Sequence, residues 1–408
     1  MKKINTIDLF AGCGGLMEGF EKEGSFNTVA CVEWEKAPCQ NLVKRLKTKW
    51  RHKNAEKEVI RFDIQRTDEL INGYSDDEYG SSVGLNNIVD GKTIHLIIGG
   101  PPCQAYSLAG RIRDENGMKN DYRNYLFESY LRIVDYYKPN FFVFENVQGM
   151  LSASPNGIPI TDEIKSAFNR SGYDVITDFN DAVFDLTEYG VPQKRKRIII
   201  LGVNMKYNCS QSIINDFYNT ILPNLKCDKV TVGQAISDLP KLYPLKNPIK
   251  KNGKTFSHSE ITQKNIHNHV PRFHNERDIK IFHLLAKDIK TGENQFTTTS
   301  KLKTLYNDII GKESNVHKYY VLRMDEQSNT IPAHLYKDGL RHIHPDPEQM
   351  RSITVREAAR LQTFDDDYEF IDGMMHQYKM IGNAVPPKFS FILAKAIKQI
   401  INKYGLEL

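Results

Sequence analysis

The stretch that most constrains the fold is the largely apolar run Ile94–Ile98, which is followed directly by Gly99-Gly100-Pro101-Pro102-Cys103-Gln104. Such a run, ended by glycine and proline, predicts a buried strand that stops abruptly. Open α/β sheets bind ligands beyond the carboxyl ends of their strands, and the two prolines stiffen the turn that presents Cys103. An isolated cysteine is more often a small buried hydrophobe, but the flanking prolines and glutamine argue against burial. Cys103 is therefore the candidate nucleophile.

Length and cysteine usage favour a reduced protein outside the membrane. A chain of 408 residues, 40% of them hydrophobic, can form one large domain and a second, smaller one. We expect no membrane span, because no run of about 18 apolar residues occurs. We expect no signal peptide either, because Met1–Asn5 leads into an apolar run without a cleavage site of small residues. The six cysteines contain no C-x-x-C pair, which favours a reducing cytoplasm and predicts neither a disulfide framework nor a zinc site.

The first predicted strands also end in groups that suit a ligand. Thr6–Phe10 predicts a strand, Ala11–Gly15 a glycine turn and Leu16–Glu23 a helix with one apolar face. Glycines let a ligand approach the backbone, although G-x-G-G is not the G-x-G-x-x-G dinucleotide fingerprint and a mere tight turn is an equal alternative. The strand expected over Thr28–Trp34 carries Glu33 near its end, which could bind a ribose or could face solvent. The strand expected over Glu58–Ile64 ends at Asp63, which could bond an adenine amino group or could simply form a turn.

An acid and a basic cluster follow the candidate nucleophile. The apolar run Phe141–Val147 ends with Glu145, and a carboxylate leaving so apolar a strand should have a raised pKa and could hold a proton. The cluster Gln193–Arg197 abuts a strand expected over Arg197–Val203, so at least one arginine should point into the site; a solvated charged face is the alternative. The other segments are expected to be a loop over Asn72–Gly91, a mobile lid over Ser107–Asn124, helices over Tyr125–Tyr137 and 161–170, and a strand over Tyr173–Phe184.

The excess positive charge lies in one later region. Between Val203 and Arg351 there are 22 Lys and Arg against 15 Asp and Glu, a net charge of +7, whereas the rest has 33 against 35, a net charge of −2. From Asn204 to His317 the pattern loses regularity, which favours a separate domain that recognises a polyanion; an ordinary solvated surface is the alternative. Ten of the twelve histidines lie between His258 and His376, but their spacing matches no common zinc pattern and we predict no metal site.

Six motifs, taken in order, resemble those of the cytosine-C5 DNA methyltransferases. They are Asp8–Gly15 (DLFAGCGG), Gly100–Gln104 (GPPCQ), Phe144–Val147 (FENV), Gln193–Arg197 (QKRKR), Thr354–Gln362 (TVREAARLQ) and Gly382–Pro387 (GNAVPP). The resemblance implies an α/β fold of the S-adenosylmethionine-dependent methyltransferase type, which is Rossmann-like. It consists of a mostly parallel sheet with helices on both faces, plus a smaller irregular target-recognition domain. We therefore expect a catalytic and cofactor-binding domain over residues 1–203, a target-recognition domain over 204–350 and a C-terminal segment, 351–408, that returns to the catalytic domain.

The resemblance implies S-adenosyl-L-methionine as the cofactor. Glu33 would take its ribose and Trp34 would stack on its adenine. Asp63 and Ile64 would hold the adenine edge. The complete set implied for the cofactor site is Phe10, Gly12, Gly14, Gly15, Leu16, Glu33, Trp34, Asp63, Ile64, Asn383 and Val385.

The resemblance also implies a catalytic set. Thiolate addition by Cys103 at C6 of cytosine would make C5 able to attack the sulfonium methyl group. Glu145 would bond or protonate ring N3, and Arg197 would bond the cytosine carbonyl. A base, for which water is one candidate, would remove the C5 proton before the thiolate leaves. The set is Cys103, Glu145, Arg195 and Arg197, together with Pro102, Gln104 and Asn146 from the same motifs.

Double-stranded DNA is the implied partner, because this chemistry requires a base flipped out of the duplex. The stretch Arg323–His334 resembles one that bacterial members carry, which favours a prokaryotic or phage restriction–modification enzyme. A cognate restriction endonuclease acting on the same site would need no stable complex, and we expect a cytoplasmic monomer. The alternatives are a transfer-RNA cytosine-C5 methyltransferase of the same family and a catalytically silent DNA-binding regulator. The large basic insert favours duplex DNA, and intact Cys103, Glu145 and Arg197 favour catalysis.

Overall fold

The computed structural model of the chain describes residues 3–102, 126–154, 158–259, 266–311, 319–337 and 339–407. It divides into two compact units. Unit 1 comprises Met1–Gly190, Arg195–Asp228 and Ala384–Leu408, and unit 2 comprises Val191–Lys194 and Lys229–Asn383. The limits of these units lie at 190/191, 194/195, 228/229 and 383/384, and the domain limits expected from the sequence lie at 203/204 and 350/351. The chain enters and leaves unit 2 twice.

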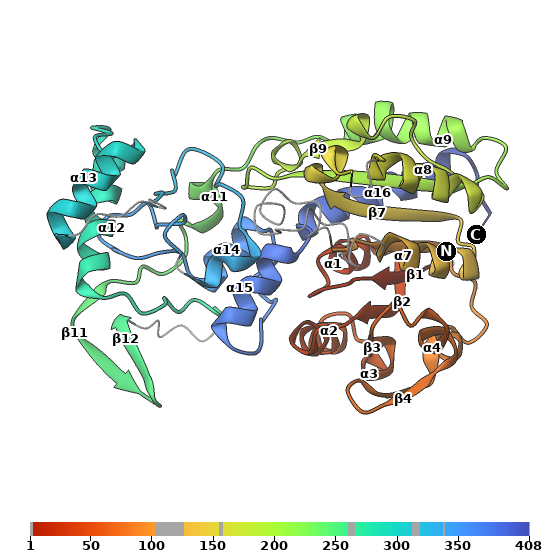
Figure 1. Cartoon of the computed structure of the whole chain (residues 1–408), viewed down its shortest axis with the longest axis horizontal. Coiled ribbons are helices and arrows are strands. Elements are labelled where there is room, and N and C mark those ends of the chain that lie inside the picture. Colours follow the sequence, from red (N-terminus) through yellow and green to blue (C-terminus); the bar gives the residue numbers. More distant parts are fainter. Residues whose placement is uncertain are drawn as a thin grey trace. The chain divides into compact units, whose positions relative to one another are not determined.

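The centre of unit 1 is an eight-stranded sheet (Figure 1). Its strands are β1 (Ile4–Leu9), β2 (Phe26–Glu33), β3 (Val59–Arg61), β6 (Leu96–Gly99), β7 (Phe141–Val147), β8 (Tyr173–Asp174), β9 (Val183–Asp185) and β10 (Lys196–Asn204). The order is β3-β2-β1-β6-β7-β10-β8, with β9 also paired to β10. The five strands from β3 to β7 run parallel, and β10 is antiparallel to its neighbours. The predicted mostly parallel sheet is confirmed.

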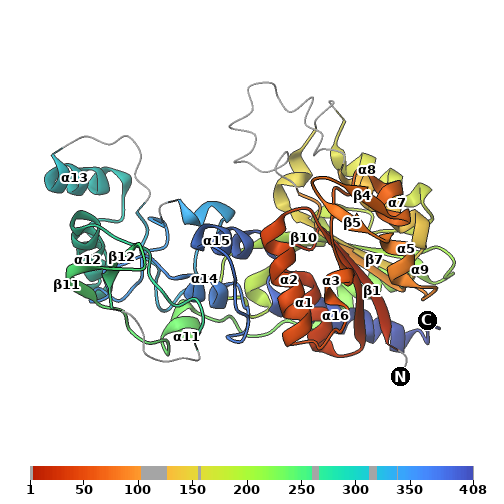
Figure 2. The ribbon, with the colours of Figure 1, turned by 90° about the horizontal axis from the view of Figure 1, so that it is seen from below.

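Helices cover the sheet because its strands are apolar on both faces, as in β7, which is buried from Phe141 to Asn146. The helices of unit 1 are α1 (Gly15–Glu23), α2 (Lys36–Thr48), α3 (Ala55–Glu58), α4 (Thr67–Asn72), α5 (Gly84–Val89), α7 (Leu126–Tyr137), α8 (Ile160–Arg170), α9 (Ser210–Asp216), α10 (Leu222–Asn224) and α16 (Pro387–Lys403). Figure 2 shows α1, α2 and α16 on one side of the strands, and α5 and α7 on the other.

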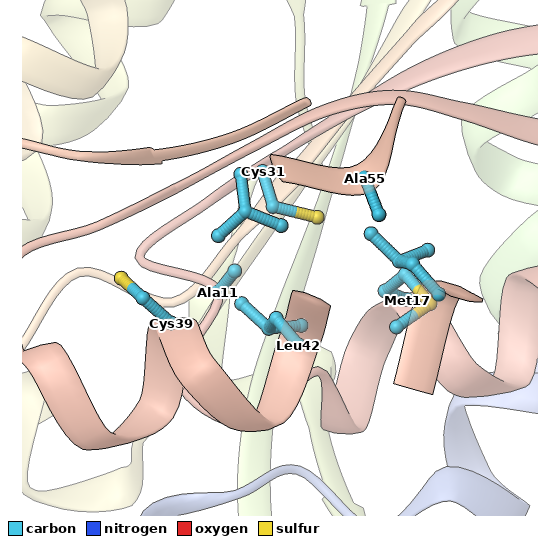
Figure 3. Packing of buried hydrophobic residues seen from close by; sticks show 8 residues of the cluster. Ala11, Met17, Cys31, Cys39, Leu42 and Ala55 are labelled. Carbon is cyan, nitrogen blue, oxygen red and sulfur yellow. The ribbon is translucent and has the colours of Figure 1, made fainter. Parts of the chain in front are cut away.

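The glycine-turn side of the sheet is closed by tight packing. Leu42 of α2, Cys31 of β2 and Met17 of α1 belong to one buried apolar cluster, seen in Figure 3. The C-terminal helix α16 lies directly on α1, where a Cβ added to Gly19 would be 2.3 Å from the backbone nitrogen of Phe391. The glycine therefore lets the two helix backbones approach closely.

Two loop-level expectations for unit 1 are wrong. The segment Asn72–Gly91 is not a plain loop: it forms a small hairpin, β4 (Tyr74–Asp76) with β5 (Gly80–Ser82), and then α5. Tyr173–Phe184 is not one strand, because a short 3-10 helix, Phe179–Ala182, separates β8 from β9. The side chain of Asp178 caps that helix by accepting from the Asn180 N–H, and such local bonding ends a strand.

The region that was expected to lose regularity, residues 204–317, contains well-defined elements. In unit 2 they are α11 (Val232–Ile236), the hairpin strands β11 (Pro244–Lys251) and β12 (Lys254–His258), α12 (Glu276–Thr291) and α13 (Thr299–Ile310). Helix α12 has an Asn275 cap, a Gly292 C-cap and an apolar stripe that includes Phe282 and Leu285, buried against α13. These helix signals were present in the sequence among many polar residues.

The later part of unit 2 has a polar core. Helix α14 (Val355–Leu361) begins with a capping box in which Thr354 and Glu357 satisfy each other's backbone N–H groups, and helix α15 (Met374–Asn383) comes after it. Fully buried Arg351 forms two hydrogen bonds of 2.7 Å with the Glu357 carboxylate. Hydrogen bonds and charge thus satisfy this buried glutamate, whose pKa Arg351 and His344 hold well below its usual range against the effect of burial.

No helix in the described part of the chain is long and apolar enough to cross a membrane.

Candidate active site

Three neighbouring strands end at one level, and the predicted motifs begin there. Leu9 of β1 pairs with Gly99 of β6, which pairs in turn with Phe144 of β7. The next residues of the three strands are Phe10, Gly100 and Glu145. The carboxyl ends of parallel strands meet at one edge, so the sheet brings the glycine turn, the nucleophile turn and the acid together.

The glycine turn after β1 has a left-handed backbone. Phe10 (φ 56°), Gly12 (φ 56°) and Gly14 (φ 83°) all have positive φ. A non-glycine residue in this region costs about 1–3 kcal/mol, and such strain is characteristic of functional sites. A Cβ on Gly12 would meet no described atom within 4 Å, whereas one on Gly15 would lie 2.2 Å from the carbonyl oxygen of Val385. The turn is therefore open beside Gly12 and closed at Gly15.

Glu33 lies at the end of β2, next to that opening. Its Oε2 accepts a hydrogen bond of 2.9 Å from the Gly12 N–H, and its Oε1 accepts one of 2.7 Å from the Glu35 N–H. Burial raises the pKa of Glu33, and the two N–H groups oppose that rise. The carboxylate fixes the glycine turn and keeps lone pairs for a ligand.

The other predicted adenosine-binding residues follow the adjacent strand ends. Trp34 comes directly after β2, and its side chain is 51% exposed. The backbone N–H of Phe62 bonds the Glu33 carbonyl, which places Asp63 and buried Ile64 just beyond β3. Asp63 accepts a hydrogen bond from the Gln65 N–H, which makes it a turn former as well.

The structure adds a residue that the sequence reasoning passed over. Asp8 of β1 is fully buried, and its Oδ2 accepts a hydrogen bond of 3.2 Å from the backbone N–H of Met17 in α1. Its Oδ1 has no hydrogen-bond partner among the described residues, and burial raises its pKa well above the usual value. The sequence signal for Asp8 was an acidic residue within an otherwise largely apolar strand. A strand that only packs in the core does not need such a residue.

The nucleophile turn lies against the end of β7. Gly100 lies so near Glu145 that an added Cβ would be 2.6 Å from its Oε2. The Asn146 side-chain amide donates to the carbonyl oxygen of Pro101 at 3.4 Å. Pro102 is exposed and is the last described residue here, because Cys103, Gln104 and the expected lid Ser107–Asn124 lie outside the described residues. The described start of the turn is thus held by the acid motif.

Glu145 is paired with an arginine of the basic cluster. In the β7–β10 ladder Glu145 lies opposite Ile199 and Val147 opposite Arg197, so Glu145 and Arg197 are diagonal neighbours on one face. Nε of Arg197 is 2.8 Å from Oε1 of Glu145, and both side chains are mostly buried. The sequence argument considered only burial for Glu145. The guanidinium of Arg197 adds an opposite charge beside the carboxylate and fixes its position.

Arg195, the other arginine of the basic cluster, contacts the C-terminal segment of the chain. Arg195 is buried, and its Nη2 donates to the carbonyl oxygen of Ala384 at 3.1 Å. Since the following residue, Val385, packs on Gly15, this bond joins the end of the basic cluster to the wall of the glycine turn. Asn383 ends α15 in unit 2 and is exposed.

These residues fit the cofactor that the motifs imply. Open space beside Gly12, a carboxylate at Glu33 with spare lone pairs, and the buried Oδ1 of Asp8 suit a ligand that carries hydroxyl and ammonium groups. No cluster of His, Cys, Asp and Glu within the described ranges could hold a metal ion.

Comparison with known proteins agrees with this geometry. Residues 4–399 match the family described as C-5 cytosine-specific DNA methylase. The chain is similar to the type II methyltransferase M.Bpa9945I of Bacillus paralicheniformis, at 34% identity over 97% of this chain and 99% of that protein. A putative type II methyltransferase of Oceanobacillus iheyensis, M.OihORF3336P, is 31% identical over 98% of this chain and 96% of its own length.

Solved structures show the same fold. A putative DNA modification methyltransferase encoded within an E. coli prophage has a TM-score of 0.63 at 22% identity, over 98% of this chain and 100% of its own. The S. pombe Dnmt2 methyltransferase has a TM-score of 0.55 at 14% identity, over 99% of this chain and 100% of its own. At these identities the likeness concerns the fold alone.

Proposed function

The chain belongs to the C-5 cytosine-specific DNA methylase family, and from this premise we infer how its own residues carry out the reaction. It is a DNA (cytosine-5) methyltransferase, which moves a methyl group from S-adenosylmethionine to C5 of cytosine in DNA. The family, the activity and the cofactor predicted from six motifs are confirmed.

The cofactor site proposed for this chain is the glycine turn with the ends of β2 and β3. When bound, S-adenosylmethionine supplies an electrophilic methyl group on a positively charged sulfur. Phe10, Gly12, Gly14, Gly15 and Leu16 would border it, and Val385 and Asn383 would close it. Glu33 would accept the ribose hydroxyls, since a carboxylate has about four lone-pair sites and the backbone N–H groups of Gly12, Trp34 and Glu35 do not occupy all of them. Trp34 would stack on adenine, and Asp63 with Ile64 would hold its edge.

The catalytic steps proposed for this chain use the residues at the ends of β6, β7 and β10. The Cys103 thiolate forms a bond from Sγ to C6 of cytosine, while Glu145 bonds or protonates N3 and so takes up the charge that develops on the ring. C5 can then accept the methyl group. Loss of the C5 proton to a base, for which water is one candidate, expels the thiolate and restores the aromatic ring. Pro102 and Gln104 would shape the nucleophile turn.

Arg197 is proposed to serve both the acid and the substrate. Its Nε contacts Glu145 and its Nη1 donates to the Lys196 carbonyl, so that Nη2 has no bond to a described residue. That N–H group is suited to the cytosine carbonyl oxygen. Arg195 and Asn146 would hold the site together through Ala384 and Pro101.

Duplex DNA with a flipped-out cytosine is the proposed substrate, because C6 and N3 are inaccessible in a stacked pair. The similar proteins carry type II methyltransferase names, which supports DNA over the transfer-RNA alternative and favours a restriction–modification role. We propose that unit 1 binds cofactor and catalyses transfer, and that unit 2 recognises the DNA sequence. We propose that the protein is a cytoplasmic monomer. A cognate restriction endonuclease would act on the same site without forming a stable complex with it.

The observation that carries this assignment is the ion pair of Glu145 with Arg197 beside the nucleophile turn. The test is expression in a host that lacks cytosine methylation, followed by bisulfite sequencing. Protected cytosines in one short recurring context are expected, and their loss is expected in Cys103→Ser and Glu145→Gln. A mechanism-based cytosine analogue in duplex DNA should trap the wild type covalently but not Cys103→Ser. Fully converted DNA from folded protein that binds S-adenosylmethionine would favour RNA or the silent regulator.

A further inference from the structure

We propose that the β11–β12 hairpin of unit 2 is a phosphate-binding arm, which supplies sequence-independent affinity for the DNA duplex. This inference rests on the proposed function, because it specifies a surface of unit 2 that would meet the DNA. It concerns four lysines, Lys246, Lys250, Lys251 and Lys254.

Hydrogen bonds of His258 and Ser257 anchor the hairpin at its base. Its two strands form a sheet of their own, and a two-stranded sheet is only marginally stable alone. From Lys246 to Lys254 every residue is exposed (Figure 1 labels both strands). The base is anchored, since Nε2 of buried His258 lies 3.0 Å from the Gln349 carbonyl oxygen and the hydroxyl of Ser257 accepts from the His274 N–H. The arm is therefore fixed at one end and exposed along its length.

A tight two-residue turn connects β11 and β12. Asn252 (φ 48°) and Gly253 (φ 75°) both have positive φ, which is the backbone of a two-residue type I′ turn. Lys251 pairs with Lys254 directly across this turn. This pairing places two positively charged side chains next to each other at the tip of the hairpin. A phosphate beside the two ammonium groups would interact favourably with both.

Charge lies on both faces of the ribbon. Lys251 and Lys254 share one face because they are paired, and Lys250, paired with Thr255, points to the opposite face. No acidic residue occurs between Pro244 and His258. Neither face can be buried in an apolar core, and a lysine-bearing two-stranded ribbon matches the shape that enters or lines a DNA groove.

Exposed aromatic rings lie at the base of the arm. Tyr243 precedes β11, exchanges hydrogen bonds with Ser259 after β12, and is 47% exposed. Phe273 is 50% exposed and precedes His274, which is bonded to Ser257 in β12. Positive charge beside exposed aromatic rings is a nucleic-acid-binding combination. A nucleic acid is thus favoured over other polyanions, and the proposed function makes it DNA.

We expect the hairpin to contribute a DNA affinity that depends on the salt concentration but not on the DNA sequence. Each phosphate contact on duplex DNA contributes about 0.9 to the slope of log K against log salt concentration, whereas phosphate contacts carry no base specificity. Changing all four lysines to glutamine should lower that slope by about 2–4 and weaken binding to cognate and unrelated duplexes by the same factor. The methylated sequence should stay the same.

The experiment measures equilibrium binding of the full chain to fluorescent duplexes across a salt series. The matched control exchanges four exposed lysines of unit 1, Lys53, Lys57, Lys92 and Lys206, for glutamine and should keep the wild-type slope. A second variant with arginine at the four hairpin positions should also keep it, which separates charge from folding. The melting temperature of the glutamine variant should stay close to that of the wild type, because all four side chains are exposed.

A wild-type slope in the folded glutamine variant would overturn the phosphate-binding arm while leaving the methyltransferase assignment intact. A weakened cognate complex with unchanged binding to unrelated duplexes would overturn it as well, because base readout would then be responsible. If the wild-type protein transferred no methyl group to DNA, the proposed function would be contradicted instead. The salt dependence of DNA binding would still test the phosphate-binding arm in that case.

Discussion

Nε of Arg197 lies 2.8 Å from Oε1 of Glu145, a diagonal pair across β7 and β10 at the edge where the nucleophile turn begins. The pair places the acid and the arginine motif, more than fifty residues apart in the chain, in direct contact. Gly100 lies beside the Glu145 carboxylate, where a Cβ could not fit without a shift. Conservative changes of Glu145 and Arg197 should therefore affect the chemistry more than the folding.

We expect Glu145→Gln to lower kcat by about 10²–10⁴, the usual contribution of a general acid or base, because the amide cannot donate a proton to N3. Cofactor binding, measured by calorimetry, should stay within twofold. Arg197→Lys should also reduce kcat, since lysine cannot present the guanidinium fork. The control is Arg170→Lys at an exposed position of α8, which should have wild-type kcat. Wild-type kcat in Glu145→Gln would remove this residue from the chemistry.

We expect Gly15→Ala to destabilise unit 1 by about 1–3 kcal/mol, as overpacking does, because its Cβ would lie 2.2 Å from the Val385 carbonyl oxygen. The free energy of unfolding comes from urea titration, and the affinity for S-adenosylmethionine should fall in parallel. Gly373→Ala is the matched control: its added Cβ meets no described atom within 4 Å, so a change within about 0.5 kcal/mol is expected. Equal stability of the two variants would show that residues 384–386 can move away.

Unit 2 should lose stability in mild acid because it buries neutral histidines. Burial lowers the pKa of His258 and of His342 to about 4, and that of His274 to about 2. The folded state then binds fewer protons than the unfolded state below the ordinary histidine pKa of about 6.5. The stability contribution is complete above that pH and is lost as the pH falls, by about 3 kcal/mol for His258 at pH 4.

The measurement is amide hydrogen exchange in unit 2 peptides at pH 7 and at pH 4.5, with rates corrected for intrinsic exchange. His258→Asn should reduce the loss of protection between the two pH values, although it lowers stability at neutral pH through the bond to Gln349. His376→Asn on the partly exposed face of α15 should keep the wild-type pH dependence. Equal protection of the wild type at both pH values would contradict this account.

Removing one partner of the buried pair Arg351 and Glu357 should lower the free energy of unfolding more than replacing both. Removing one partner, as in Glu357→Gln, leaves an uncompensated buried charge and should cost about 3–5 kcal/mol of unfolding free energy. Replacing both, as in Arg351→Met with Glu357→Leu, should cost less than the single change, although the Thr354 N–H then loses its acceptor. Thermal unfolding of both variants and the wild type decides this; a double variant less stable than the single one would contradict it.

The sequence alone determined much of unit 1. Short apolar runs that stop at Gly99, Glu33 and Glu145 predict strands whose ends face one edge, because strand formation and turn chemistry are local properties. The same residues carried the motifs from which the family, the cofactor and the reaction were predicted. Helix α12 was missed although its Asn275 cap and Gly292 C-cap are local signals, because its apolar stripe is diluted by charged residues.

Only the tertiary structure decided which side chains meet. That Arg197 pairs with Glu145 depends on the antiparallel register of β10, and that Val385 packs on Gly15 depends on the C-terminal segment returning to a turn 370 residues earlier. The orphaned Oδ1 of Asp8 and the Lys251–Lys254 opposition likewise appear only once burial and register are fixed. Local propensity depends on neighbours in the chain, whereas these contacts arise between segments brought together by burying apolar surface, and no local pattern encodes them.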